Sequence, residues 1–142
     1  MNPVFQETFS IEKMDFVAAG EAASTIKARL RSIGIDSKLI RRVAIATYEA
    51  EMNMIIHSDG GVITFMVEPS SICISCDDTG PGIADISLAM QEGYSTAPDY
   101  VRIMGFGAGM GLPNIKRSCD AFSIESSVEG THMCMRFEIS PP

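Results

Sequence analysis

The hydrophobic pattern of the first half of the chain predicts one strand followed by two helices. Residues 4–12 are compatible with an edge strand. Asp15 is placed to cap a helix over residues 15–32, which Gly34 would stop. A second helix is predicted over residues 36–57, because apolar residues recur there at helical spacing before a turn sequence. These apolar positions are Ile40, Val43, Ala44, Thr47 and Tyr48.

The second half of the chain is richer in strand patterns. Residues 62–68 and 71–76 read as two strands of a hairpin joined at Pro69 and Ser70. Residues 121–128 and 132–139 alternate as a final hairpin around Glu129 and Gly130. We therefore expect at least two antiparallel hairpins in the sheet.

Three further segments lie between these hairpins. Residues 85–92 are typical of a short helix, and residues 93–104 form an irregular polar stretch that we interpret as a mobile lid. A helix is predicted over residues 111–120, with Pro113 in its first turn. Mixed strands and helices with mostly hairpin connections indicate an α+β two-layer sandwich, with a mostly antiparallel sheet covered by helices on one face.

Length and charge limit the possible functions. The 142 residues, 46% of them hydrophobic, are expected to form a single domain over residues 1–142. The net charge of −7 and the scattered lysines and arginines argue against nucleic-acid binding. The densest basic segments, residues 27–31 and 38–42, are interpreted as solvated helix faces, with a partner-docking face as the alternative. Neither a signal sequence nor a membrane segment is recognisable, so we expect a soluble cytoplasmic protein.

Cys73 and Cys76 have the C-x-x-C spacing of metal and redox sites, but the segment around them alternates like a strand. Residues three apart on a strand point to opposite faces, so this pair is not expected to chelate one ion. We interpret all four cysteines as small buried hydrophobic residues.

One face of the second predicted helix carries Glu49 and Asn53, with Ile45 before them and Ile56 or His57 after them. A solvated glutamate and an asparagine bonded to the backbone would explain this pair without any function. The functional alternative is an Asn53 amide oxygen on Mg²⁺ and a Glu49 carboxylate that accepts a proton. Glu51 points to the other side of the helix and is expected to be solvated.

Two glycine clusters complete the set of candidate residues. Asp78 follows a strand and precedes Gly80 and Gly82, so its carboxylate either belongs to an ordinary turn or accepts a hydrogen bond from the amine of adenine. Glycines at positions 105, 107, 109 and 111 run into a helix, where backbone N–H groups and the helix dipole favour phosphate. The P-loop, dinucleotide and eukaryotic kinase motifs are all missing.

Four short motifs follow one another along the chain: Glu49-x-x-x-Asn53, Asp78-x-Gly80-x-Gly82-Ile83, Gly107-x-Gly109-x-Gly111-Leu112 and Gly130-Thr131. In this order they resemble the four boxes of the GHKL ATPases. Residues 93–97 and the sequence from Gly109 to Arg117 are most similar to the anti-sigma-factor serine/threonine kinases of bacterial partner-switching systems. The departure is a longer segment at residues 98–104.

This resemblance implies a Bergerat-type fold that binds ATP and Mg²⁺. It implies that Glu49 is the general base, Asn53 binds Mg²⁺, Asp78 binds adenine and Thr131 lies near the base. The implied nucleotide-binding positions are Asn53, Asp78, Gly80, Gly82, Ile83, Gly107, Ala108, Gly109, Met110, Gly111, Leu112 and Thr131.

The resemblance also implies a substrate, which is a serine or threonine of a small STAS-domain antagonist protein. A sigma factor or a phosphatase is a further implied partner, and a homodimer is compatible with the family. One alternative is a nucleotide-gated binding module that sequesters a partner without turnover. Another is a detached histidine-kinase catalytic domain, which the sequence favours least because it has no phosphoacceptor helix.

Overall fold

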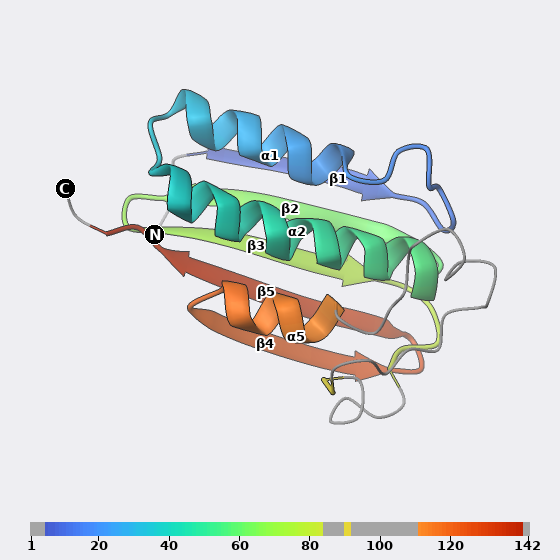
Figure 1. Ribbon diagram of the computed structural model, residues 1–142. Coiled ribbons are helices and arrows are strands. Elements are labelled where there is room, and N and C mark those ends of the chain that lie inside the picture. The colour runs from blue at the N-terminus through green and yellow to red at the C-terminus, as the bar shows by residue number, and fades with distance from the viewer. Residues whose placement is uncertain (1–4, 84–89, 92–110, 141–142) are drawn as a thin grey trace.

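The computed structural model describes residues 5–83, 90, 91 and 111–140 (Figure 1). The elements in chain order are β1 (Phe5–Ile11), α1 (Glu21–Ser32), α2 (Ser37–His57), β2 (Gly61–Glu68), β3 (Ser71–Asp78), α5 (Gly111–Ser118), β4 (Ala121–Ser127) and β5 (Gly130–Glu138).

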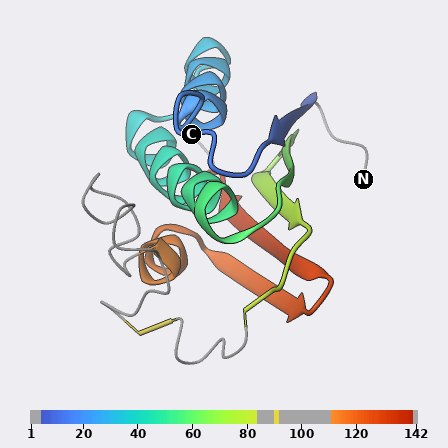
Figure 2. The same ribbon diagram turned by 90° about the vertical axis from the view of Figure 1, so that its right-hand side faces the viewer.

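The strands form one antiparallel sheet in the order β1-β2-β3-β5-β4. The helices α1, α2 and α5 lie side by side on one face of this sheet, as Figures 1 and 2 show. The predicted α+β sandwich is therefore confirmed, as are the edge position of the first strand and the two predicted hairpins.

The core lies between the sheet and the helices. Alternation along the strands brings apolar residues to this face in rows across the sheet, for example Phe65, Ile74 and Met135. The fully buried residues Ile26, Leu30, Val43, Ile55 and Ile115 cover these rows from the helices. Each such side chain contributes roughly 1.5–3 kcal/mol on burial, so this interface supplies most of the free energy that holds the two layers together.

The first helix begins later than its sequence predicts. Residues 15–20 are not helical, and the Asp15 carboxylate accepts a hydrogen bond from the N–H of Ala18 at 3.2 Å in a turn. Gly20 has a φ of 92°, which no α-helix accommodates, so α1 starts at Glu21. The prediction that Asp15 caps this helix was wrong.

Most other boundaries agree with the sequence. The helix predicted over residues 36–57 is α2, with Asp36 accepting a hydrogen bond from the N–H of Lys38. The strand predicted to end at residue 76 continues to Asp78, and the helix predicted to reach residue 120 ends at Ser118. The short helix over residues 85–92 and the lid over residues 93–104 fall mostly outside the described residues.

The apolar pattern of α2 identified only part of its buried face. Ile40, Val43 and Thr47 are buried as expected, but Tyr48 is 38% exposed. Helix α2 packs against both α1 and the sheet, so its buried face also includes Ala46, Ala50 and Met54. None of the described helices is long and apolar enough to cross a lipid bilayer.

The cysteines of β3 point to opposite faces of the sheet, as their strand spacing predicts. Cys76 lies in the core between sheet and helices, whereas Cys73 is buried on the other face, beside Arg136. Cys119 and Cys134 are only half-buried, so the prediction of full burial was wrong for these two.

Candidate functional site

Four chain segments meet at one end of the sandwich. The carboxyl ends of α2 and β3, the amino end of α5 and the β4–β5 turn all lie at the right-hand edge of Figure 1, which faces the viewer in Figure 2. The N–H of Asp59 donates to the carbonyl of Thr79 at 2.8 Å and fixes the end of α2 beside the end of β3. The structure thus brings the predicted site residues that it describes, from distant parts of the sequence, to one edge.

Helix α2 presents Glu49, Asn53 and His57 on one half-exposed stripe. Residues four apart lie above one another on a helix, so these side chains point the same way. The N–H₂ group of Asn114 on α5 donates a hydrogen bond to the Glu49 carboxylate at 3.4 Å. Glu49 is therefore oriented by the neighbouring helix while part of it stays accessible.

Asn53 lies against the start of α5. A Cβ atom at Gly111 would sit 3.0 Å from the amide oxygen of Asn53, so the glycine keeps the space beside this amide open. An amide oxygen is a hard ligand of the kind Mg²⁺ takes, with phosphate and water oxygens completing the octahedron. Asn53 therefore fits the predicted role in a magnesium site that is shared with a ligand.

His57 is a weak candidate for contact with phosphate. Burial lowers the pKa of its imidazole below the usual histidine value of 6.5. The ring is consequently neutral near pH 7 and adds no positive charge to the site.

Asp78 stands at the end of β3, across the site from α2. Its Oδ1 atom accepts a hydrogen bond from the N–H of Thr131 at 2.9 Å, so β5 holds this carboxylate in place. Burial raises the pKa of Asp78, and the hydrogen bond from Thr131 acts in the opposite direction. A half-buried carboxylate with one oxygen anchored to the backbone is well placed to accept a hydrogen bond from a ligand with its other oxygen.

Ser126 connects the first glycine cluster to the last hairpin. Its hydroxyl lies 2.8 Å from the Thr131 hydroxyl and accepts a hydrogen bond from the N–H of Ile83 at 2.7 Å. The sequence analysis did not identify this serine. The β4–β5 register pairs Ser126 with Thr131 and could have identified it. That register can be assigned only when the ends of both strands are known.

Gly82 passes very close to the β4–β5 turn. It has a φ of 74°, and a Cβ atom there would collide with the carbonyl oxygen of Ser127. Gly80 also has a positive φ, and its N–H donates to the carbonyl of Glu129. Both glycines are thus required by the path of the backbone, and that path brings Ile83 to Ser126.

Gly130 offers a direct test of this packing. A Cβ atom at this position would collide with the carbonyl oxygen of Asp78, which is backbone and has little freedom to move. Gly130→Ala is expected to destabilise the protein by roughly 2 kcal/mol and to displace Asp78. Thermal unfolding and titration with ATP measure the two effects.

The matched control for this variant is Gly34→Ala. Gly34 also has a positive φ, of 82°, but a Cβ atom there meets nothing within 4 Å. This control carries the backbone strain without the collision. Equal losses of stability and of ATP affinity in the two variants would contradict the role assigned to close packing at Gly130.

The remaining predicted positions fall into two groups. Leu112 is 6% exposed and its side chain packs in the core, and its contact with a nucleotide stays a prediction. Gly107, Ala108, Gly109 and Met110 lie outside the described residues. Among the described residues, no group of three or more histidines, cysteines or acidic residues is arranged to hold a metal ion.

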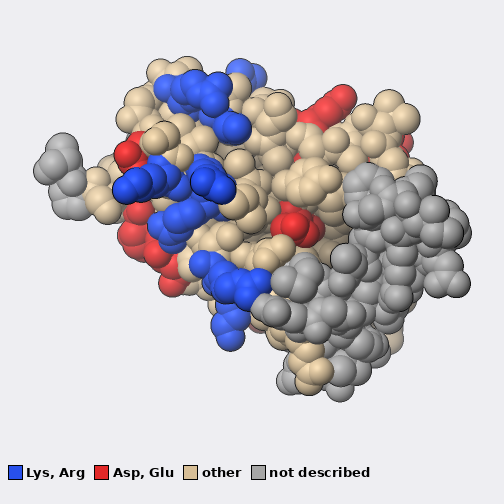
Figure 3. All heavy atoms as spheres, in the orientation of Figure 1, with Lys and Arg blue, Asp and Glu red and all other residues tan. Residues whose placement is uncertain are grey.

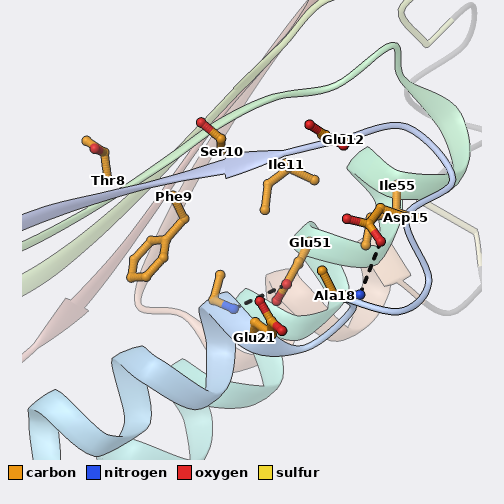
Figure 4. A pocket seen from close by; sticks show the side chains of 11 residues that line it. Thr8, Phe9, Ser10, Ile11, Glu12, Asp15, Ala18, Glu21, Glu51 and Ile55 are labelled. Atoms are coloured by element: carbon orange, nitrogen blue, oxygen red, sulfur yellow. Dashed lines mark hydrogen bonds between the residues drawn. The ribbon is translucent and has the colours of Figure 1, made fainter.

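Glu51 is the clearest disagreement with the sequence analysis, which placed it in solvent. It is 1% exposed, and its carboxylate accepts hydrogen bonds from the N–H groups of Gly20, Ala22 and Ala23. Figure 4 shows the Glu51 side chain pointing from α2 toward the start of α1. A helix begins with N–H groups that have no partner within the helix. Glu51 supplies those partners to α1 from α2, which explains the missing local cap.

Comparisons with known proteins show which family this chain belongs to. The histidine kinase-like ATPase domain family matches residues 15–137. The serine/threonine-protein kinase RsbT of Bacillus subtilis is 31% identical over 124 residues, which are 84% of this chain and 85% of that protein. An anti-sigma F factor of Clostridium acetobutylicum is also 31% identical, over 134 residues that cover 87% of this chain and 90% of that protein.

A solved structure has the same fold. The RsbU and RsbW domains of Rv1364c from Mycobacterium tuberculosis superpose with a TM-score of 0.68 at 18% identity. The match covers 99% of this chain and 34% of that longer chain. The chain belongs to the histidine kinase-like ATPase domain family, in the branch that includes the RsbT kinase and the anti-sigma F factors. The family resemblance predicted from the sequence is thereby confirmed.

Proposed function

We propose that this protein is an ATP-dependent serine/threonine kinase of a partner-switching system, with a small STAS-domain regulator as its substrate. The observation that supports this proposal most directly is the stripe on α2. Glu49 and Asn53 face the same space, Asn114 orients the Glu49 carboxylate, and Gly111 keeps the space beside Asn53 open. A proton acceptor thus lies one helical turn from a hard metal ligand.

The roles of the residues follow from their chemistry. Asn53 would bind Mg²⁺, which neutralises the charge on the transferring phosphate. Glu49 would accept the proton of the attacking serine or threonine hydroxyl. The amino end of α5 at Gly111 would present backbone N–H groups to phosphate, together with the preceding glycines. Asp78, anchored by Thr131, would accept a hydrogen bond from the adenine amine.

The assignment of Asp78 predicts nucleotide selectivity. Asp78→Asn is expected to weaken ATP binding about 10-fold or more, because the hydrogen bond to a charged acceptor is lost. Affinity for GTP, which has no amine at that position, should change much less. Titration of the purified variant with ATP and with GTP measures the ratio.

Asp77→Asn is the matched control. Asp77 is adjacent in sequence, but it points to the opposite face of the sheet, where its carboxylate pairs with His132 at 2.8 Å. It should bind ATP like the wild type. An unchanged ratio of ATP to GTP affinity in Asp78→Asn would argue against the adenine contact.

The kinase function itself is tested by phosphate transfer. The protein is incubated with Mg²⁺, radiolabelled ATP and each STAS-domain protein encoded in the same genome, and the product is treated with acid. Acid-stable label on a serine or threonine is expected. Acid-labile label would instead indicate a phosphohistidine and the histidine-kinase alternative.

A nucleotide-gated binding module is the second candidate. The similarity to an anti-sigma F factor over 87% of the chain favours it, since that relative is named for an effect on a sigma factor. Tight ATP binding without transfer to any STAS-domain protein would support this alternative. The next experiment would then be a binding assay with the sigma factors and phosphatases of the same genome.

A further inference from the structure

The positive charge of this acidic protein gathers on its helices. Eight of the eleven lysines and arginines lie on α1, α2 and α5, namely Lys27, Arg29, Arg31, Lys38, Arg41, Arg42, Lys116 and Arg117. Figure 3 shows lysine and arginine side chains gathered on the helical face of the molecule. The sequence analysis interpreted the basic segments 27–31 and 38–42 as solvated helix faces, with a partner-docking face as the alternative. That the segments lie together becomes visible only when the helices lie side by side.

A groove between α1 and α2 runs through this basic area. It has a volume of about 580 Å³, and Lys27, Arg31 and Arg41 line it. Within the described part of the chain, these three cations have no ion-pair partner, whereas neighbouring Arg29 and Arg42 are paired with acidic residues. Unpaired like charges in one groove repel one another, so an anionic partner would stabilise them.

The groove also exposes large apolar side chains. Ile45 is 40% exposed and Tyr48 is 38% exposed, and both line the groove beyond the cations. Tyrosine and arginine side by side are typical of protein interfaces. Since the whole chain carries a charge of −7, a long polyanion such as duplex DNA would be repelled by the remaining surface. These observations favour a protein with a local acidic patch.

Glu49 lines the same groove. Arg41, Ile45 and Glu49 are four residues apart on α2, so they form one stripe along the helix. Arg41 and Glu49 are eight positions apart on the helix, which corresponds to a rise of about 12 Å. A protein that lies in the groove therefore reaches the cations and Glu49 at the same time.

We propose that the α1–α2 groove is the docking surface for the substrate protein, which presents an acidic patch about 12 Å from the serine or threonine that approaches Glu49. This inference rests on the proposed kinase function for the role of Glu49. The docking itself does not require transfer. The basic end selects the partner by charge, and the apolar stripe sets the distance between the acidic patch and the hydroxyl group.

The test measures binding with the charges of the groove reversed. Lys27 and Arg31 are exposed, so Lys27→Glu with Arg31→Glu should leave the fold intact. Binding to each purified STAS-domain protein of the same genome is measured with Mg²⁺ and ADP, so that no transfer takes place. The double variant is expected to lose about 100-fold in affinity for the protein that binds the wild type, with ADP affinity unchanged.

The matched control is Lys13→Glu with Arg136→Glu, which alters the net charge equally but outside the groove. This control should retain wild-type affinity. Replacing the acidic patch of the partner with lysines should restore binding to the groove variant. Equal affinity of the groove and control variants would overturn the proposal, as would failure of all these STAS-domain proteins to bind the wild type.

Two further outcomes separate this inference from the kinase function. Phosphate transfer with an unchanged KM for the partner in the groove variant would overturn the docking surface and leave the kinase proposal standing. Groove-dependent binding without any transfer would support the docking surface and overturn the kinase proposal. Groove-dependent binding to a DNA duplex or to phosphatidylglycerol vesicles, with no protein bound, would replace the protein partner with a polyanion and overturn the proposal.

Discussion

Replacing Glu49 by alanine is expected to lower the rate of phosphate transfer by about 10³-fold, because the variant has no group to accept the proton of the attacking hydroxyl. ATP affinity should stay within about twofold of the wild type, since Glu49 is assigned to the hydroxyl and not to the nucleotide. Single-turnover transfer from radiolabelled ATP to the STAS-domain substrate measures the rate, and a nucleotide titration measures the affinity.

Two control variants strengthen this experiment. Glu68→Ala removes a partly exposed carboxylate at the opposite end of the sheet and should transfer phosphate like the wild type. Glu49→Gln keeps an oxygen able to accept the hydrogen bond from Asn114 but removes the basic carboxylate, so it should be about as slow as the alanine variant. Full activity in either Glu49 variant would refute the assignment of the base and favour the binding-module alternative.

Replacing Glu51 by alanine is expected to lower the free energy of unfolding by about 3 kcal/mol, which corresponds to roughly 10 °C in the midpoint of thermal unfolding. The buried carboxylate accepts hydrogen bonds from three backbone N–H groups at the start of α1. In the variant these donors lose their partners. Each unsatisfied buried donor costs about 1–3 kcal/mol, and water that enters the space and accepts a hydrogen bond reduces this cost. Chemical denaturation measures the loss.

Glu49→Ala is the matched control for stability. It removes a glutamate from the same helix two residues away, but that side chain is only half-buried and its hydrogen bond from Asn114 is long, at 3.4 Å. Its effect should stay below about 1 kcal/mol. If the two alanine variants unfold at the same denaturant concentration, Glu51 does not anchor α1 as proposed.

The pH dependence of stability provides a second measurement for Glu51. Burial raises its pKa, so the folded protein retains this proton to a higher pH than the unfolded chain does. The stabilisation from this proton is complete below the usual glutamate pKa of 4.5 and is lost as the pH rises through the higher folded value. Glu51→Gln does not titrate, so its stability should lack this part of the slope.

The two glutamates of α2 show where sequence reasoning succeeds and where it fails. Glu49 and Asn53 were predicted to share a face because helical spacing is a local property of the chain, and α2 presents them as expected. Glu51 is equally polar, and from the sequence alone it was expected to be solvated. Its burial depends on α1, whose first N–H groups lie against it, and nothing in the local sequence of α2 encodes that contact.

The start of α1 has the same explanation. Asp15 has the residue type and position of a helix cap, and the sequence contains no competing local signal except Gly20. The acceptor that replaces a local cap comes from residue 51, about thirty positions away. A helix boundary set by such a distant side chain is not readable from the neighbouring residues.

The sequence by itself determined the order of strands and helices, the edge position of the first strand, the α+β class and the family, because these follow from local periodicity and from short motifs. The tertiary structure alone decided which end of the sandwich collects Glu49, Asn53, Asp78 and Thr131, and how Ser126 ties two of their segments together. It also decided that lysines and arginines from three helices form one basic face beside Glu49. Such groupings depend on the packing of elements distant in sequence, and the spacing of residues along one chain does not specify them.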